Sequence, residues 1–200
     1  EKKCNLKSIT REDIIDYLPR ERQTMLFSAT MPSAVKRLAT FHMKENRASI
    51  KMEPSEQNTP KIMHSYINVQ DTEKEKVLLD LLTVENPDSC IIFCNTKDAV
   101  ESVNQHLFKA GLPIDKLHGG MEQNDRLAVM NDFRSRKMRY LVATDVAARG
   151  IDIENVTHVI NFDVPFEKES FIHRTGRTGR AGKTGLALTL VSDKDQHRWE

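Results

Sequence analysis

The sequence contains few cysteines, and none of them has the spacing of a metal-binding or redox motif. Cys4, Cys90 and Cys94 form no CxxC pair, and two of them lie in or beside an apolar run. This usage is typical of a reducing cytosol and argues against a disulfide scaffold or a zinc site. The chain also lacks an apolar run of about 18 residues and a signal-peptide pattern, so we expect a soluble, cytoplasmic protein without a membrane partner.

Neither sign of charge dominates the chain. Thirty Lys and Arg residues against 29 Asp and Glu residues leave a formal net charge of +1. This balance argues against a polybasic tail or a wholly basic binding face. Contacts with nucleic acid would have to come from local basic clusters, which occur at 134–139 and 174–183.

A phosphate-binding P-loop is also missing. The tripeptide GKT at 182–184 would need a glycine five places before Gly182, where Arg177 stands, and it leads into an apolar run instead of a helix. No acidic run is present that could hold magnesium. We therefore expect that the chain by itself does not assemble the magnesium–nucleotide site of a P-loop NTPase and does not turn over ATP.

From Ser89 onward, short apolar runs alternate with amphipathic stretches of helical length. Strands are predicted at 89–94, 113–118, 139–144, 157–162 and 184–191, and helices at 97–109, 122–133 and 167–172. This alternation predicts an α/β fold, a parallel sheet sandwiched by helices. Ligands of such sheets bind outside the carboxyl ends of the strands, where Asn95, His118, Thr144 and Asp163 fall.

A separate block precedes this domain. Helices are predicted at 11–18 and 32–44 and buried strands at 24–29 and 48–52, while the polar segment 53–60 with two prolines is typical of a linker. Two strands and two helices are too few for an independent sheet domain. We therefore expect residues 1–57 to be the remnant of a domain whose beginning is missing, together with its linker, and residues 58–200 to form a second domain.

The run HRTGRTGR, from His173 to Arg180, places Arg174, Arg177 and Arg180 in a turn between a helix and a strand. Guanidinium groups bind phosphate oxygens in pairs, and arginine fingers of phosphoryl-transfer enzymes stabilise charge in this way. The run therefore predicts a phosphate ligand. The alternatives are a solvated basic turn and, for His173, a hydrogen-bonded core histidine.

Two further segments follow predicted strands. In ATDVAARGID, at 143–152, Thr144 could contact a phosphate oxygen, Gly150 allows close backbone approach and Asp152 could accept hydrogen bonds from a ribose. In HGGMEQNDR, at 118–126, Gly119 and Arg126 could hold a sugar-phosphate backbone. Each segment by itself is also compatible with ordinary turns and helix caps.

The order of these segments resembles a known family. The chain is similar to motifs III, IV, IVa, V and VI of the superfamily 2 DEAD-box RNA helicases at SAT (from Ser28), IIFCNT (from Ile91), HGGMEQNDR (from His118), ATDVAARGID (from Ala143) and HRTGRTGR (from His173). The stretches around motifs IV, V and VI are most similar to the bacterial DbpA-type branch. The histidine at His173 favours RNA, since related DNA helicases commonly have glutamine there.

The resemblance implies two RecA-like lobes with ATP and Mg²⁺ between them and RNA across both. This chain would be the last part of the first lobe, the linker and the second lobe, with the magnesium ligands in the missing part. The residues implied are Arg177, Arg180 and His173 for catalysis, Gly150 and Asp152 with both arginines for ATP, Gly119, Arg126 and Thr144 for RNA, and Ser28 and Thr30 for coupling between the lobes.

The activity implied is unwinding of short RNA duplexes with ATP hydrolysis, on structured ribosomal RNA during assembly of the large ribosomal subunit. The Q motif, the Walker A loop and the DEAD box are absent from the 200 residues. The alternative is that the chain is a non-catalytic module that binds RNA or a partner lobe.

Overall fold

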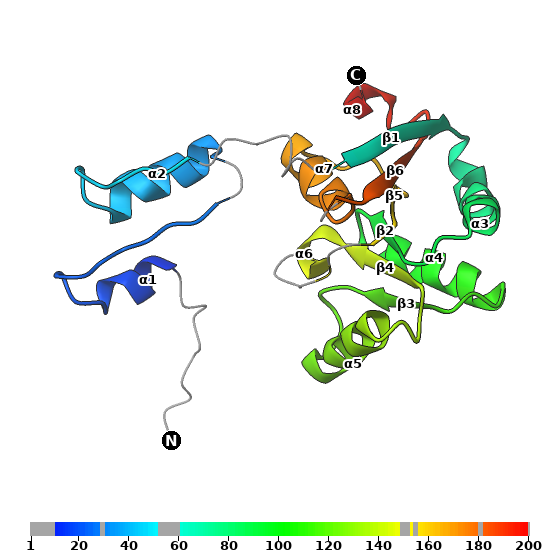
Figure 1. The fold of residues 1–200 in the computed structure, drawn as a ribbon, viewed down its shortest axis with the longest axis horizontal. Helices are drawn as coiled ribbons and strands as arrows, with labels where there is room; N and C mark the ends of the chain where they lie inside the picture. The colour runs from blue at the N-terminus through cyan, green and yellow to red at the C-terminus, as the bar shows by residue number, and fades with distance from the viewer. Residues whose placement is uncertain are drawn as a thin grey trace. The chain divides into compact units, whose positions relative to one another are not determined.

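The structure is a computed structural model that describes residues 11–28, 31–51, 61–148, 153, 156–179 and 182–199. The chain divides into two compact units, Glu1–Met52 and Glu53–Glu200, and each is considered by itself. Helices and strands of both units are labelled in Figure 1. Within these ranges, no helix has the length and apolar character needed to cross a membrane.

The second unit is built on a parallel sheet, as the apolar runs predicted (Figure 1). Its strands are β1 (Lys61–Asn68), β2 (Cys90–Cys94), β3 (Ile114–Leu117), β4 (Tyr140–Thr144), β5 (His158–Asn161) and β6 (Thr184–Val191). In the described residues they form one six-stranded sheet in the order β1-β6-β5-β2-β4-β3, with every neighbouring pair parallel. All carboxyl ends therefore meet at one edge of the sheet.

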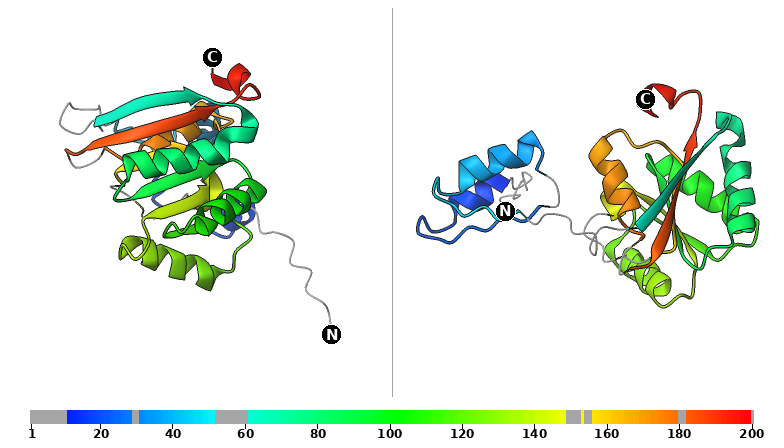
Figure 2. Two further views of the ribbon diagram at one scale, coloured as in Figure 1. Left: turned by 90° about the vertical axis from the view of Figure 1, so that its right-hand side faces the viewer. Right: turned by 45° about the horizontal axis from the view of Figure 1, so that its top comes forward.

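Helices cover both faces of this sheet. They are η1 (Asp71–Glu73), α3 (Lys74–Glu85), α4 (Lys97–Lys109), α5 (Gln123–Arg134), α6 (Asp145–Ala148), α7 (Lys168–Thr175) and α8 (Gln196–Trp199). Because successive strand residues point to opposite faces, Ile92 joins a core cluster with residues of α3 and α4, whereas Phe93 joins one with residues of α5 and α6. Figure 2 shows α3 and α4 on one side of the sheet and α7 on the other.

The elements predicted from Ser89 onward are confirmed, and α4 and β6 have the predicted bounds. The sequence pattern predicts no element for residues 61–88, where β1 and α3 lie. β1 is an edge strand in which every residue is exposed or only partly buried, so it carries no apolar run from which a strand could be predicted. The turn predicted after β4 is the short helix α6.

The first unit contains the two predicted helices but not the two predicted strands. α1 (Arg11–Asp16) and α2 (Ser33–His42) lie within the predicted helical ranges, and Pro32 caps α2 in extended conformation. Residues 24–28 and 48–51, however, form no strand, and Phe27 is 87% exposed. The prediction is wrong here because a strand needs backbone partners, and the described part of this unit supplies none.

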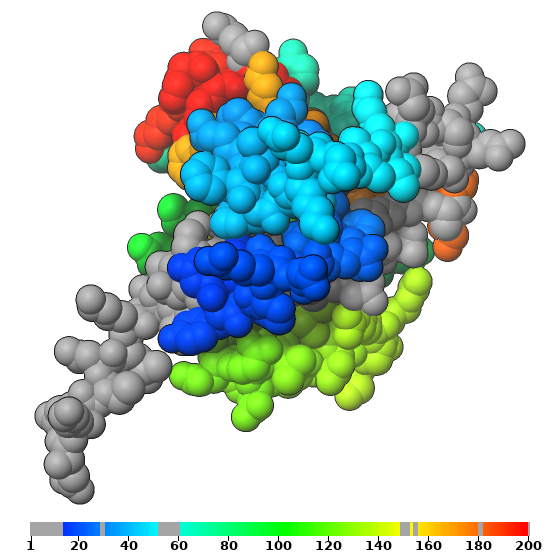
Figure 3. All heavy atoms as spheres, turned by 90° about the vertical axis from the view of Figure 1, so that its left-hand side faces the viewer, coloured from blue at the N-terminus to red at the C-terminus, as the bar shows by residue number. Residues whose placement is uncertain are grey.

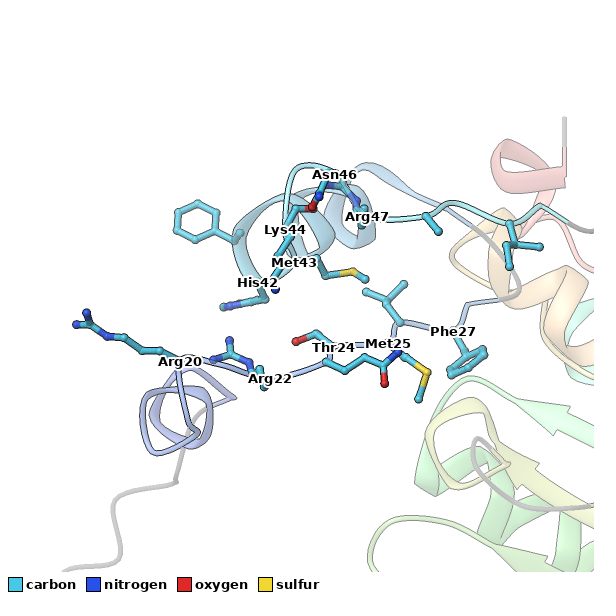
Figure 4. A pocket seen from close by; sticks show the side chains of 15 residues that line it. Arg20, Arg22, Thr24, Met25, Phe27, His42, Met43, Lys44, Asn46 and Arg47 are labelled. Atoms are coloured by element: carbon cyan, nitrogen blue, oxygen red, sulfur yellow. The ribbon is translucent and has the colours of Figure 1, made fainter.

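The first unit is hollowed between its extended segment and the end of α2. Its residues are coloured blue to cyan in Figure 3. A cavity of about 780 Å³ lies between the segment that carries Met25 and Phe27 and the residues that follow α2. Figure 4 shows Met43 pointing from the end of α2 toward the segment with Thr24. The unit therefore leaves apolar side chains without a packed core on this side.

Candidate functional site

Arg174 is a structural residue, not a member of an open phosphate-binding turn. α7 continues to Thr175, three residues beyond the predicted helix end, so His173 and Arg174 lie in its last turn. The Arg174 side chain is 1% exposed. The expectation that Arg174, Arg177 and Arg180 converge on one anion is thus wrong for Arg174.

The Arg174 guanidinium joins the carboxyl ends of three strands. It donates to both carboxylate oxygens of Asp145 at 2.7 Å and to Oδ1 of Asn95 at 2.7 Å. It also donates to the Asp163 carbonyl at 2.8 Å and lies over the Phe93 ring, 5.3 Å from its centroid. A buried cation is tolerated only when it is paired and hydrogen-bonded, and these contacts meet that requirement. They fix α7 against β2, β4 and β5.

Asp163 links this arginine to a second buried cation. Its carboxylate accepts from the Asn95 backbone N–H at 2.9 Å and from Lys74 Nζ at 3.4 Å. Lys74 is 3% exposed and also donates to Asp195 at 2.8 Å. Burial opposes ionisation of Asp195, but hydrogen bonds from Lys74 and Ser192 outweigh it and lower the pKa of this carboxyl. Lys74 was not predicted from the sequence, because a single lysine at a helix start usually lies in solvent.

Arg177 lies beside the segment that carries the predicted nucleotide contacts. It is half-buried, and its guanidinium donates to the carbonyl of Ala148 at 3.2 Å and to that of Ile153 at 3.5 Å. Ala148 and Ile153 flank in sequence the predicted contacts Gly150 and Asp152. Those two residues, together with Arg180 and Thr30, lie outside the described residues.

The turn after α7 is held by side-chain and backbone packing. Thr178 is fully buried, and its hydroxyl donates to the carbonyls of Val156 and Thr157. Gly179 has φ +72°, and a Cβ there would lie 2.7 Å from the Lys61 carbonyl oxygen, so only glycine fits. At the GKT tripeptide, Thr184 begins β6, which confirms that this segment leads into a strand and not a helix.

The three predicted RNA contacts come to the same edge of the sheet. Thr144 ends β4 and is buried, and Gly119 follows the neighbouring strand β3. A Cβ on Gly119 would meet no atom within 4 Å, so no contact within the described residues requires glycine there. Arg126 of α5 lies 3.5 Å from the Ala147 carbonyl, and its buried Nε has no hydrogen-bond partner in the described structure.

Of the residues predicted to couple the lobes, His173 is half-buried in α7, and Ser28 is an exposed residue of the first unit.

The free thiols of Cys90 and Cys94 are buried in β2, and burial raises the pKa of both. Across the described ranges, no group of three or more His, Cys, Asp and Glu side chains is arranged to hold a metal ion.

Comparison with known proteins shows the family and the fold of the chain. Residues 73–182 match the model of the helicase conserved C-terminal domain. The chain is 53% identical over 181 residues to the ATP-dependent RNA helicase DbpA of Bacillus subtilis, covering 90% of this chain and 38% of that protein. It is 44% identical over 184 residues to the DEAD-box ATP-dependent RNA helicase CshA of Geobacillus kaustophilus, covering 92% of this chain and 39% of that one. The chain thus spans about two fifths of the length of these curated relatives.

Solved structures show the same fold. Dbp5 of S. cerevisiae, bound to RNA and ADP BeF3, has a TM-score of 0.81 and 32% identity over 94% of this chain and 50% of that one. E. coli SrmB, bound to regulator of ribonuclease activity A, has a TM-score of 0.66 and 37% identity over 70% of this chain and 82% of that one. The six-stranded parallel sheet with its flanking helices is therefore RecA-like. The chain belongs to the DEAD-box helicase family and contains its conserved C-terminal domain.

Proposed function

We propose that this chain supplies the second RecA-like lobe, and the last part of the first, of an ATP-dependent RNA helicase that unwinds short duplexes. The observation that carries the proposal is the position of Arg177 and of the predicted RNA contacts. Arg177 reaches the Ala148 carbonyl of α6, and Arg126 reaches the Ala147 carbonyl of the same helix. The proposed nucleotide and RNA contacts would thus share one short helix at the carboxyl edge of the sheet.

On the nucleotide side, Arg177 and Arg180 would stabilise charge at the γ-phosphate, with His173 as their partner, and Gly150 and Asp152 would contact the nucleotide. The rigid anchoring of Thr178 and Gly179 supports this role, because a finger must be held in place before the charge develops. Mg²⁺ would neutralise phosphate charge. We assign its ligands to the first lobe, since the chain has no acidic run.

On the RNA side, Gly119, Arg126 and Thr144 would bind phosphates of the backbone. The open space over Gly119 supports this assignment, since a phosphate can approach the backbone there, and the half-buried Arg126 places a positive charge at the same edge of the sheet. Backbone contacts carry no base information directly, which suits unwinding without sequence preference.

We assign residues 1–57 to the end of the first lobe with the linker, and residues 58–200 to the second lobe. The exposed apolar side chains and the cavity in the first unit support this assignment. In a complete sheet, neighbouring strands would cover these side chains and fill the cavity. Ser28 and Thr30 would then couple nucleotide state to lobe closure together with His173.

The test is reconstitution with an amino-terminal helicase lobe that carries a Walker A loop and a DEAD box. The mixture is expected to release phosphate from ATP in the presence of RNA, while the chain alone is not. Arg177→Ala should lower this rate by about 10³-fold, as for other arginine fingers. The matched control is Lys109→Ala, on an exposed position at the end of α4. Turnover by the chain alone, or an unchanged rate with Arg177→Ala, would contradict the proposal.

We also propose the finer assignment, to ribosomal RNA, large-subunit assembly and the cytoplasm, which rests on the resemblance of the sequence to the DbpA-type branch. Cross-linking the tagged chain in cells and sequencing the attached RNA tests it, with enrichment of ribosomal RNA expected. The alternative function, a module that binds a partner without catalysis, is favoured by the SrmB chain that was solved with a regulator protein bound. Failure of the reconstituted mixture to hydrolyse ATP would support it.

A further inference from the structure

His118 makes two hydrogen bonds that determine which of its ring nitrogens carries the hydrogen. Its ring is buried at the end of β3. Nδ1 lies 3.1 Å from the Gly120 backbone N–H, which can only donate, and Nε2 lies 2.8 Å from a carboxylate oxygen of Glu101. Nδ1 is therefore unprotonated, and Nε2–H donates to Glu101. The surroundings select one neutral tautomer of the ring.

Glu101 stays a carboxylate in this arrangement. It lies on α4, and its second oxygen accepts a hydrogen bond from Lys116 of β3. The bond from Lys116 and then the bond from His118 lower the pKa of this carboxyl. Glu101 is therefore ionised at neutral pH and can accept from Nε2–H, and this bond keeps Nδ1 of the ring turned toward Gly120.

The same histidine closes the Gly119–Gly120 turn from both ends. Its carbonyl accepts from the Met121 backbone N–H at 3.3 Å, and its ring accepts from Gly120. A Cβ on Gly120 would lie 3.2 Å from Nδ1, whereas a Cβ on Gly119 would meet no atom within 4 Å. The turn is thus fastened at Gly120 and left open at Gly119.

We propose that His118, oriented by Glu101, is a positioning residue for RNA phosphate at Gly119. The proposal rests on the proposed function, in which Gly119 contacts the RNA backbone. A turn that is ordered before binding does not lose conformational freedom when the phosphate arrives, and affinity rises accordingly. His118 itself touches no phosphate. It acts through the backbone of the turn.

The test uses binding of decauridylate to the full ¹⁵N-labelled chain, followed by amide chemical shifts. Asparagine can place an acceptor near the position of Nδ1 and bond the N–H two residues on, whereas glutamine reaches only the position of Nε2. His118→Ala and His118→Gln are expected to raise Kd roughly three- to tenfold, the range for one lost hydrogen bond. His118→Asn is expected to stay within about twofold of wild type.

His106→Asn serves as the matched control, because His106 is a histidine of α4 that pairs with Glu75 and lies outside the turn. Nitrogen shifts of the His118 ring in the RNA-free chain should show a protonated Nε2 and an unprotonated Nδ1. If the alanine variant does not fold, the difference in Kd between the asparagine and glutamine variants still tests the proposal.

Two results would overturn the proposal, and they are distinguishable. Equal affinities of the asparagine and glutamine variants, with wild type binding RNA, would remove the role of His118 and leave the proposed function standing. Absence of RNA binding by wild type would overturn both.

Discussion

Replacing Arg174 with alanine is expected to destabilise the second unit strongly. The side chain is 1% exposed and pairs with both oxygens of Asp145, whose side chain is 24% exposed. Removing one partner of a buried ion pair costs about 3–5 kcal/mol, because the other charge is left without compensation. Since water still reaches Asp145 in part, we expect the lower end, about 3 kcal/mol.

Urea denaturation measures this change, with Trp199 as the probe. It is the single tryptophan of the chain and packs on Tyr66 and Phe171, with ring centroids 5.4 and 6.2 Å apart, so its fluorescence reports the second unit. With a denaturant slope of about 2 kcal/mol per molar urea, a loss of about 3 kcal/mol lowers the midpoint by about 1.5 M.

Arg177→Ala provides the internal comparison. Arg177 is half-buried and its guanidinium donates to two carbonyls, so its loss should change the free energy of unfolding by about 1 kcal/mol or less. The proposed function nevertheless predicts that this variant lowers reconstituted ATP hydrolysis by about 10³-fold. Equal stability of the two variants, or a loss below about 1 kcal/mol for Arg174→Ala, would refute the distinction between a structural arginine and a finger.

Further predictions concern pH, thiols and proteolysis. Burial lowers the pKa of His158, so the unfolded chain takes up a proton more readily; stability should fall as pH drops from about 7 to about 5, and His158→Gln should flatten this slope in urea titrations. Cys90 and Cys94 should react with a thiol reagent only after unfolding, and native-state labelling of either would count against their burial. Limited proteolysis should leave a stable core that starts near Pro60, whereas a resistant first unit would contradict the assignment of a partial lobe.

The strands of the second unit were predictable where burial on both faces produces a continuous apolar run. β2 and β4 are buried at every position, and both were predicted from sequence to within one residue. β1 was not predicted, because an edge strand has too little buried surface to shape its sequence. The strand predicted at 24–29 does not form, although the segment has the apolar residues of a buried strand. The described residues provide no neighbouring strand to pair with it.

The candidate site shows the same division. Its residue types and their order, with a run of arginines, glycine turns and a hydroxyl at a strand end, were determined by the sequence alone. The role of Glu101 could not be predicted from the sequence, since a glutamate on a helix is usually solvated.

Which arginine is buried and which reaches the rim was decided only by the tertiary structure. Arg174 and Arg177 occupy similar places in one repeating run, so local sequence cannot separate them. The partners that bury Arg174 are Asn95, 79 residues away, and Asp145, 29 residues away. Only formation of the parallel sheet brings these strand ends together. The buried position of Arg174 between them has a low dielectric, so its charge must be paired, whereas the half-buried Arg177 is not under this constraint.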